Sequence, residues 1–426
     1  MTRPIIAPGI ATGIAPTRNT RPRLVATRRL GAGIAAATAL ATAACAQDGA
    51  GQGGYFDGPP NGAAYDQAPA FDGQTRAPAL PEGPALRQEV LAEGLEHPWG
   101  LAALPDGAWL VTERPGRMRV IAADGTLSDP VSGLPEVDAR DQGGLHDVSV
   151  APDFAQTRRV WWTYAEPRGE GRNATAVATG ILSEDGTTMQ DATRIWQQEP
   201  AWASTKHFGA RIVHDGQGHI IVGLGERSNP EPRQLAQDPQ ASLGKTIRID
   251  AVDGTPAGAG TDGWLPEIWT MGHRNIQGAA MGPDGRVWTN EHGPRGGDEL
   301  NLIEAGDNNG WPLATYGTDY DGSRMGATTA EGTDQPVYYW DPSPALSGMA
   351  FYDGEMFPDW QGDALLGGLQ SKSIIRLRIE GDRVTGEQRH AEGIGRVRDI
   401  EVARDGAIMV ITDEEDGALI RLTPEG

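Results

Sequence analysis

Cysteine and lysine are nearly absent from this chain of 426 residues. Cys45 is the only cysteine, which excludes a disulfide framework, a thiolate zinc site and a cysteine nucleophile inside the folded body. Lysine occurs three times, so arginine carries nearly all of the positive charge. Basic residues number 36 against 58 acidic ones, and the net charge of −22 argues against a nucleic-acid surface, because binding phosphates requires clustered cations. An anionic ligand would need a local basic pocket.

Long helical patterns are also missing. Glycine, with 59 residues, and proline, with 31, exceed ordinary usage and predict many turns. Hydrophobic residues make up 38% of the chain, which is enough for a sizeable core. The composition therefore argues against a helical bundle and for a folded body rich in short elements.

The N-terminus has the pattern of an export signal. The first 30 residues contain six arginines and no acidic residue, and a small apolar run follows from Gly31 to Ala44. This run is too short for a membrane-spanning helix, which needs about 20 apolar residues. Residues 1–46 are predicted to be a signal peptide or a lipoprotein signal, and the protein is predicted to be periplasmic. Cleavage could follow Ala46 or precede Cys45, which would then carry a lipid anchor, since LATAAC at 40–45 resembles a bacterial lipobox.

Residues 47–87 are rich in Gly, Ala, Pro, Asp and Gln and show no hydrophobic periodicity. Such a segment cannot bury enough apolar surface to offset the entropy lost on ordering, so we predict a disordered linker there. The folded domain is predicted to span residues 88–426.

One sequence unit recurs six times in this domain: an apolar alternating run, a turn containing Asp or Gly, and a second apolar run. The copies are 99–113, 144–164, 210–226, 277–291, 347–369 and 400–413. Each copy is typical of a β-hairpin, and a lone hairpin cannot bury both faces. We therefore predict an all-β, six-bladed β-propeller, with inserts near 167–205, 227–266 and 307–340 forming a pocket at the central axis. A β-sandwich or a β-helix is the alternative.

Candidate catalytic residues lie between the copies. His207 precedes the third copy and can act as a general base, because the unperturbed pKa of histidine is close to neutrality. Glu226 ends the same copy and could orient that imidazole. Arg274 precedes the fourth copy, and Arg396 and Arg398 precede the sixth. Convergent guanidinium groups suit carboxylates or phosphates, whereas surface ion pairs are the plainer interpretation.

Acidic, glycine-rich turns follow the fourth copy. The run EHGPRGGDELN at 291–301 and the run GDNNGWP at 306–312 combine exposed carbonyls with carboxylate and amide oxygens, which suits a hard cation such as calcium. Neither run has the spacing of an EF-hand, and His292 is more typical of a structural residue than of a ligand.

Several motifs together resemble the soluble PQQ-dependent glucose/sorbosone dehydrogenase family, and most of all its periplasmic aldose sugar dehydrogenase branch. They are QGG at 142–144, KHFG at 206–209, GHRNIQG at 272–278, EHGPRGGDELN at 291–301, NGWP at 309–312 and RVRD at 396–399. The resemblance spans roughly residues 92–424 in the family's order. It implies a six-bladed propeller, in agreement with the repeat count.

By this resemblance, His207 is the general base for the C1 hydroxyl of a sugar, Glu226 holds it, and Arg274 polarises the quinone of PQQ. Further cofactor contacts are implied for Gln142, Asn275, Arg396, Arg398 and Trp340. The carbonyls of Gly293 and Pro294 would hold a calcium ion at the cofactor, and Glu299 and Asn309 a second, structural one. Where the family has a lysine that contacts PQQ, this chain has Gln370, and Lys372 is the predicted substitute.

The resemblance implies an exported quinoprotein that oxidises aldoses at C1 to lactones and passes the electrons to a soluble acceptor that the sequence does not identify. Two alternatives remain from the residues alone. One is a calcium-dependent lactonase, which would need no arginine cluster. The other is a sugar-binding propeller without PQQ, against which Arg274, Arg396 and Arg398 argue.

Overall fold

The computed structural model describes residues 67–425. The predicted signal, Cys45 and the first part of the predicted linker lie outside these residues. Within the described part of the chain, no helix is both long enough and apolar enough to cross a membrane.

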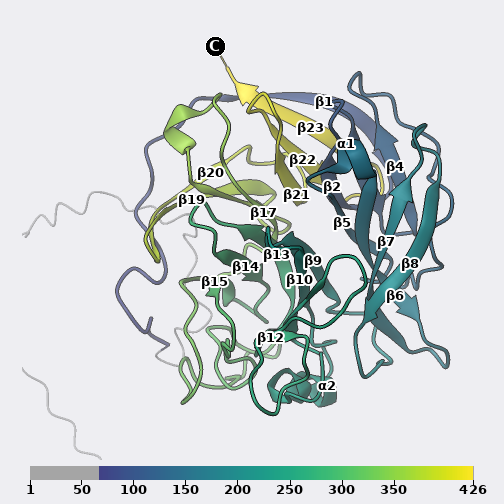
Figure 1. Cartoon of the computed structure of the whole chain (residues 1–426). Coiled ribbons are helices and arrows are strands. Elements are labelled where there is room, and N and C mark those ends of the chain that lie inside the picture. The colour runs from purple at the N-terminus through teal and green to yellow at the C-terminus, as the bar shows by residue number, and fades with distance from the viewer. Residues whose placement is uncertain (1–66, 426) are drawn as a thin grey trace, which may run out of the picture. The chain divides into compact units, whose positions relative to one another are not determined.

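Six antiparallel sheets are arranged as the blades of a propeller, which confirms the predicted fold (Figure 1). Blade 1 consists of β2 (Pro98–Ala103), β3 (Trp109–Glu113) and β4 (Arg117–Ile121). Blade 2 consists of β5 (Leu145–Val150), β6 (Arg159–Pro167), β7 (Asn173–Leu182) and β8 (Met189–Gln197). Blade 3 consists of β9 (Gly209–His214), β10 (His219–Leu224), β11 (Lys245–Asp250) and β12 (Ile268–Met271).

The second half of the ring follows the same plan. Blade 4 consists of β13 (Ile276–Met281), β14 (Val287–Glu291), β15 (Asp298–Ile303) and β16 (Tyr338–Trp340). Blade 5 consists of β17 (Leu346–Phe351), β18 (Ala364–Gly368), β19 (Ser373–Glu380) and β20 (Arg383–His390). Blade 6 consists of β21 (Val397–Val402), β22 (Ile408–Thr412), β23 (Gly417–Pro424) and β1 (Leu86–Leu95).

The six sequence copies form the two inner strands of the six blades. The first strand of each copy lies at the axis, and each contacts the next around the ring until β21 meets β2. The hydrophobic core lies between the blades, where buried side chains such as Leu110, Trp162 and Val222 belong to one cluster spanning blades 1 to 3. Apolar residues at alternate strand positions thus fill the interfaces, while the strand starts reach the axis.

The two ends of the described chain close the ring. β1 pairs antiparallel with β23, from Leu86 opposite Pro424 to Leu95 opposite Gly417. Blade 6 is therefore built from both ends of the domain, and unfolding either end exposes the edge of this blade.

Residues 67–87 correct the predicted linker, because they pack on the propeller. Gln74 is fully buried and donates to the carbonyl of Pro336 at 2.9 Å, while the amide of Ala77 donates to the hydroxyl of Tyr338 at 2.7 Å. Ala79 forms a bridge with Glu387 of β20. Backbone hydrogen bonds to the outer strands order this segment even though its composition lacks hydrophobic periodicity.

The predicted inserts also need correction, because all three contain blade strands, and the third, 307–340, ends in β16. Residues 167–205 contain β7 and β8, and residues 227–266 contain β11. The short helix α2 (Pro230–Gln234) and a 3-10 turn at Leu235–Gln237 lie in the second insert, before β11. Helix α1 (Phe154–Thr157) and the 3-10 turn at Pro358–Trp360 lie instead within copies two and five. The segment between β15 and β16 is a long irregular loop.

Candidate active site

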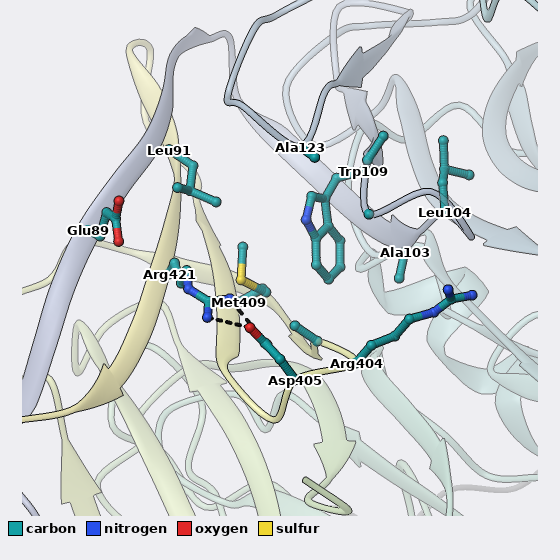
Figure 2. A pocket seen from close by; sticks show the side chains of 13 residues that line it. Glu89, Leu91, Ala103, Leu104, Trp109, Ala123, Arg404, Asp405, Met409 and Arg421 are labelled. Atoms are coloured by element: carbon teal, nitrogen blue, oxygen red, sulfur yellow. Dashed lines mark hydrogen bonds and ion pairs between the residues drawn. The ribbon is translucent and has the colours of Figure 1, made fainter. Parts of the chain in front are cut away.

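Two cavities of similar size lie at opposite ends of the inner strands. The axial pocket, of about 420 Å³, is lined by Trp99 at the start of β2 and Arg398 at the start of β21. The seam cavity, of about 440 Å³, lies between blades 6 and 1 (Figure 2). Trp109, Met409 and an Arg421–Asp405 ion pair line the seam cavity, and none of the predicted site residues does. The chemistry of the lining, and not the volume, identifies the axial pocket as the candidate site.

All six blades contribute to the axial pocket. Its lining residues are Trp99, Arg114, Asp141, Gln142, His146, Phe208, Gly209, Asn275, Gln277, His292, Ala345, Leu369, Gln370, Arg396, Arg398 and Asp413. Four of the predicted cofactor contacts, Gln142, Asn275, Arg396 and Arg398, are among them. The lining carries three arginines, on a chain whose net charge is −22.

His207 and Glu226 form a buried hydrogen-bonded pair beside the pocket. Nδ1 of His207 lies 2.8 Å from Oε1 of Glu226, whose Oε2 accepts from the amide of Ser228 at 2.7 Å. His207 has a left-handed backbone with φ of 50°, and a Cβ at Gly225 would lie 1.9 Å from its carbonyl oxygen. Only glycine permits this close approach, so the ends of the third copy hold the pair together.

Burial and, after it, the neighbouring positive charge of Arg274 lower the pKa of His207 to about 4, against the raising effect of Glu226. The imidazole is therefore neutral near pH 7. Because the bond to Glu226 occupies Nδ1, Nε2 remains available to accept a proton.

Arg274 is buried beside His207 and is held from three sides. Its guanidinium donates to the carbonyl of His292 at 3.0 Å and to the hydroxyl of Tyr320 at 3.3 Å, and it lies over the ring of Trp311 at 5.3 Å. Its backbone amide donates to Glu291 at 2.5 Å. The backbone amide of Glu226 donates to the carbonyl of Arg274 at 3.0 Å, so the structure brings Arg274 next to the His207–Glu226 pair.

The predicted cofactor contacts connect the histidine to the arginine cluster. Oε1 of Gln142 accepts from the amide of His207 at 2.9 Å, and Oδ1 of Asn275 accepts from the amide of Gly209 at 3.1 Å. Arg398 donates to Gln277 at 3.0 Å and forms a very short ion pair with Asp413. Gln142 and Asn275 thus brace the backbone around the base.

Arg114 and Asp413 were missed by the sequence analysis although both line the pocket. Arg114 directly follows the first copy, and Asp413 is the last residue of the sixth. A systematic comparison of copy ends, where Glu226 was noticed, would have singled out both positions. His146, whose ring lies between Trp99 and Phe208, was also missed.

Trp340 and Lys372 do not line the axial pocket. Trp340 lies on β16, the outermost strand of blade 4, and is buried against Tyr338 while its indole donates to Glu387 at 3.2 Å. Lys372 is exposed in the turn between β18 and β19, whereas Gln370 lines the pocket.

The residues predicted to hold calcium lie in two places. The amide of Gly293 donates to Asp298 at 2.9 Å, and Pro294 is buried beside it, next to the His292 carbonyl that binds Arg274. Glu299 lies opposite Glu291 in the β14–β15 register, and burial together with that second carboxylate raises its pKa well above the usual range.

Asn309 belongs to the same region as Glu299, although they are joined only through other residues. It contacts His273 at 3.2 Å, and His273 contacts Glu291 at 2.8 Å. Among residues 67–425, no three His, Asp or Glu side chains converge as a metal-binding group. Any calcium site here would therefore depend on backbone and amide oxygens as well as carboxylates.

A polar layer lies beneath the axial pocket. Arg211 pairs with Asp147 at 3.1 Å and with Asp399 at 2.8 Å, and its other nitrogens donate to the carbonyls of Gln277 and Arg398. Its guanidinium also stacks over Trp99 at 4.2 Å. These contacts tie five blades together and separate the axial pocket from a smaller cavity further along the axis.

Buried histidines predict a loss of stability in acid. Burial lowers the pKa of His390, far from the pocket, to about 4 from an ordinary value of 6.5. The unfolded chain therefore binds the proton first, so this contribution is complete above pH 6.5 and is lost as the pH falls toward 4. In the His390→Gln variant, the fall in the free energy of unfolding between pH 7 and 4.5 should be smaller by about 1–3 kcal/mol.

Chemical denaturation at pH 7.0, 5.5 and 4.5 measures this difference. Buried carboxyl groups such as Asp147, whose pKa burial raises to about 6, titrate in the same window. The readout is therefore the slope of the free energy of unfolding against pH, compared between the variant and the unchanged protein. Equal slopes would contradict the prediction.

Comparisons with known proteins agree with this fold. The chain is 44% identical over 357 residues to the aldose sugar dehydrogenase YliI of Escherichia coli (strain K12), covering 81% of this chain and 95% of the relative. It is similar to the apo-form crystal structure of the soluble aldose sugar dehydrogenase of Escherichia coli, with a TM-score of 0.75, 42% identity, and coverage of 80% of this chain and 100% of that chain.

A second solved structure is the PQQ-bound form of the aldose sugar dehydrogenase of Streptomyces coelicolor, with a TM-score of 0.66, 27% identity, and coverage of 81% of this chain and 100% of that chain. The family model described as glucose/sorbosone dehydrogenase matches residues 95–421, which include strands of all six blades. The chain therefore belongs to the glucose/sorbosone dehydrogenase family.

Proposed function

We propose that the protein is a PQQ- and calcium-dependent aldose sugar dehydrogenase that oxidises the C1 hydroxyl of an aldose to a lactone. The observation that carries the proposal is the buried His207–Glu226 pair beside Arg274, at the edge of an arginine-lined axial pocket. A neutral base next to a fixed cation and an anion-binding pocket is the arrangement that hydride removal from an alcohol requires.

The pocket's own atoms fit an anionic cofactor. Nε of Arg114, Arg274 and Arg398 is buried without a hydrogen-bond partner in each case. Buried donors without acceptors are costly, and carboxylate or quinone oxygens would satisfy them. Gln142, Asn275, Arg396 and Arg398 would hold the cofactor, with the carbonyls of Gly293 and Pro294 toward a calcium ion.

When bound, PQQ would supply the acceptor for the hydride from C1, and calcium would make its quinone more electrophilic. Nε2 of His207 takes the hydroxyl proton as the C1–H bond breaks. Glu226 fixes the ring through Nδ1 and stabilises the imidazolium that forms. Arg274 stabilises negative charge that develops beside it, in a site from which burial excludes much of the water.

The test is reconstitution of the apoprotein. Adding PQQ with Ca²⁺ should produce dye-linked oxidation of aldoses and a lactone product, and chelating the calcium before PQQ is added should prevent it. Hydrolysis of lactones without PQQ would favour the lactonase alternative. No turnover across a panel of aldoses and alcohols, with PQQ bound, would count decisively against a dehydrogenase.

We also propose that the protein is exported to the periplasm by residues 1–46. The support is the arginine-rich start and the short apolar run that follows it. Mass spectrometry of the mature protein tests this proposal. A new N-terminus after Ala46 would indicate a cleaved signal, and a diacylated Cys45 would indicate a lipid anchor. Protein that keeps residues 1–46 and is found only in the cytoplasm would refute export.

A further inference from the structure

Asp413 is the point at which the arginines of the axial pocket meet. Its carboxylate forms a very short ion pair with Arg398, and lies 3.5 Å from Arg114 and 3.9 Å from Arg396. Its other contact is Nδ1 of His97 at 2.9 Å. Although burial would raise the pKa of Asp413, these arginines hold it well below the usual range. One buried carboxylate thus serves three guanidinium groups from blades 1 and 6.

The pocket consequently carries surplus positive charge. The second carboxylate in its lining, Asp141, is exposed and accepts from the hydroxyl of Thr205 at 3.0 Å. Arg398 is buried, and its pKa is lowered by that burial and by the nearby charges of Arg114 and Arg211. An additional anion in the pocket would relieve this repulsion.

Arg114 is fixed so that its side chain reaches this pocket. Its backbone amide donates to the carbonyl of His97 at 3.1 Å, and a Cβ at Gly144 would lie 1.9 Å from its carbonyl oxygen. One terminal nitrogen donates to the carbonyl of Asp141 at 2.7 Å, the other faces Asp413, and Nε is buried without a partner. The guanidinium is therefore held at both ends, with its Nε donor unused.

We propose that Arg114 is a third anion-binding arginine of the axial pocket, positioned by Asp413, and that it binds a carboxylate of the tricarboxylate cofactor. This inference rests on the proposed function and extends its cofactor site to blade 1. A planar guanidinium suits the role, because its fork matches a carboxylate while the Asp413 contact fixes its orientation. Blades 1 and 6 would then share the binding of the cofactor's negative charge.

The experiment measures PQQ binding to the apoprotein by titration calorimetry in the presence of Ca²⁺. Arg114→Ala should raise the Kd at least tenfold, and Arg114→Lys, which keeps the charge but not the fork, should raise it less. Arg404→Ala is the matched control, because Arg404 is exposed at the opposite end of blade 6. This variant should bind PQQ with an unchanged Kd. A thermal melt of each apoprotein verifies that the variants are folded.

A second ligand identifies the group that Arg114 contacts. If it binds a carboxylate, the Kd of the PQQ trimethyl ester should differ little between the unchanged protein and Arg114→Ala. Equal Kd values for PQQ in the unchanged protein, Arg114→Ala and Arg114→Lys would overturn the inference and leave the proposed function standing. Absence of PQQ binding to the unchanged protein would overturn the proposed function, and this inference with it.

Discussion

Replacing His207 by alanine should lower kcat for aldose oxidation by about 10²–10⁴-fold, the range that a positioned general base contributes. The reason is geometric: the 2.8 Å bond to Glu226 leaves Nε2 to receive the proton, and burial keeps the ring neutral. The measurement is dye reduction by protein loaded with PQQ and Ca²⁺, with an absorbance spectrum to establish that the cofactor is still bound.

Two variants separate proton acceptance from orientation of the ring. Glu226→Gln keeps a similar shape but removes the charge that stabilises the imidazolium, so kcat should fall by less than in His207→Ala. His214→Gln is the control, because this histidine ends strand β9, which begins two residues after His207, but contacts Ser149 outside the pocket. Normal turnover by PQQ-loaded His207→Ala would contradict the assignment of the base.

Replacing Arg274 by leucine should have two effects at once. We expect kcat to fall by about 10²–10³-fold, as for loss of a group that stabilises developing charge in a buried site. We also expect the pKa of His207 to rise, because the charge of Arg274 is, after burial, the main cause of its lowering. Steady-state kinetics measure the first effect, and titration of the apoprotein followed by NMR measures the second.

Arg233→Leu is the matched control for Arg274, since both guanidiniums lie over the ring of Trp311. It should change neither kcat nor the pKa of His207. A fall in kcat in Arg274→Leu with the histidine pKa unmoved would mean that the two side chains do not act within one site.

The propeller could be predicted because its signal is repeated. Six copies of one hairpin pattern each supplied evidence for the inner strands, because every copy repeats an apolar run, a turn and a second apolar run. The outer strands carried a weaker signal. β8 (Met189–Gln197), for example, has an exposed and polar face, so its region was interpreted as an insert. Backbone pairing at the edge of a blade places such a strand where side-chain pattern does not.

The site was predictable where its residues cluster in short motifs. His207, Arg274 and Asn275 lie in such motifs, and the structure places all three at one end of the axis. Arg114 and Asp413 are nearly 300 residues apart in the sequence, and no local pattern relates them. Their 3.5 Å contact arises only because the ring closes blade 6 against blade 1. Trp340 lies outside the lining of the axial pocket, and its aromatic motif belongs to a hydrophobic cluster that includes the outer strand β16.

The polar layer around Arg211, beneath the axial pocket, has a kinetic consequence. Arg211 and its two aspartates fill the axis beneath the axial pocket. The sugar and the electron acceptor would therefore have to enter through the same opening, one after the other. The oxidised sugar would then depart before the acceptor arrives. Initial rates measured while both reactants are varied should give parallel double-reciprocal lines, as in a ping-pong mechanism. Intersecting lines would mean that the two reactants occupy the enzyme together.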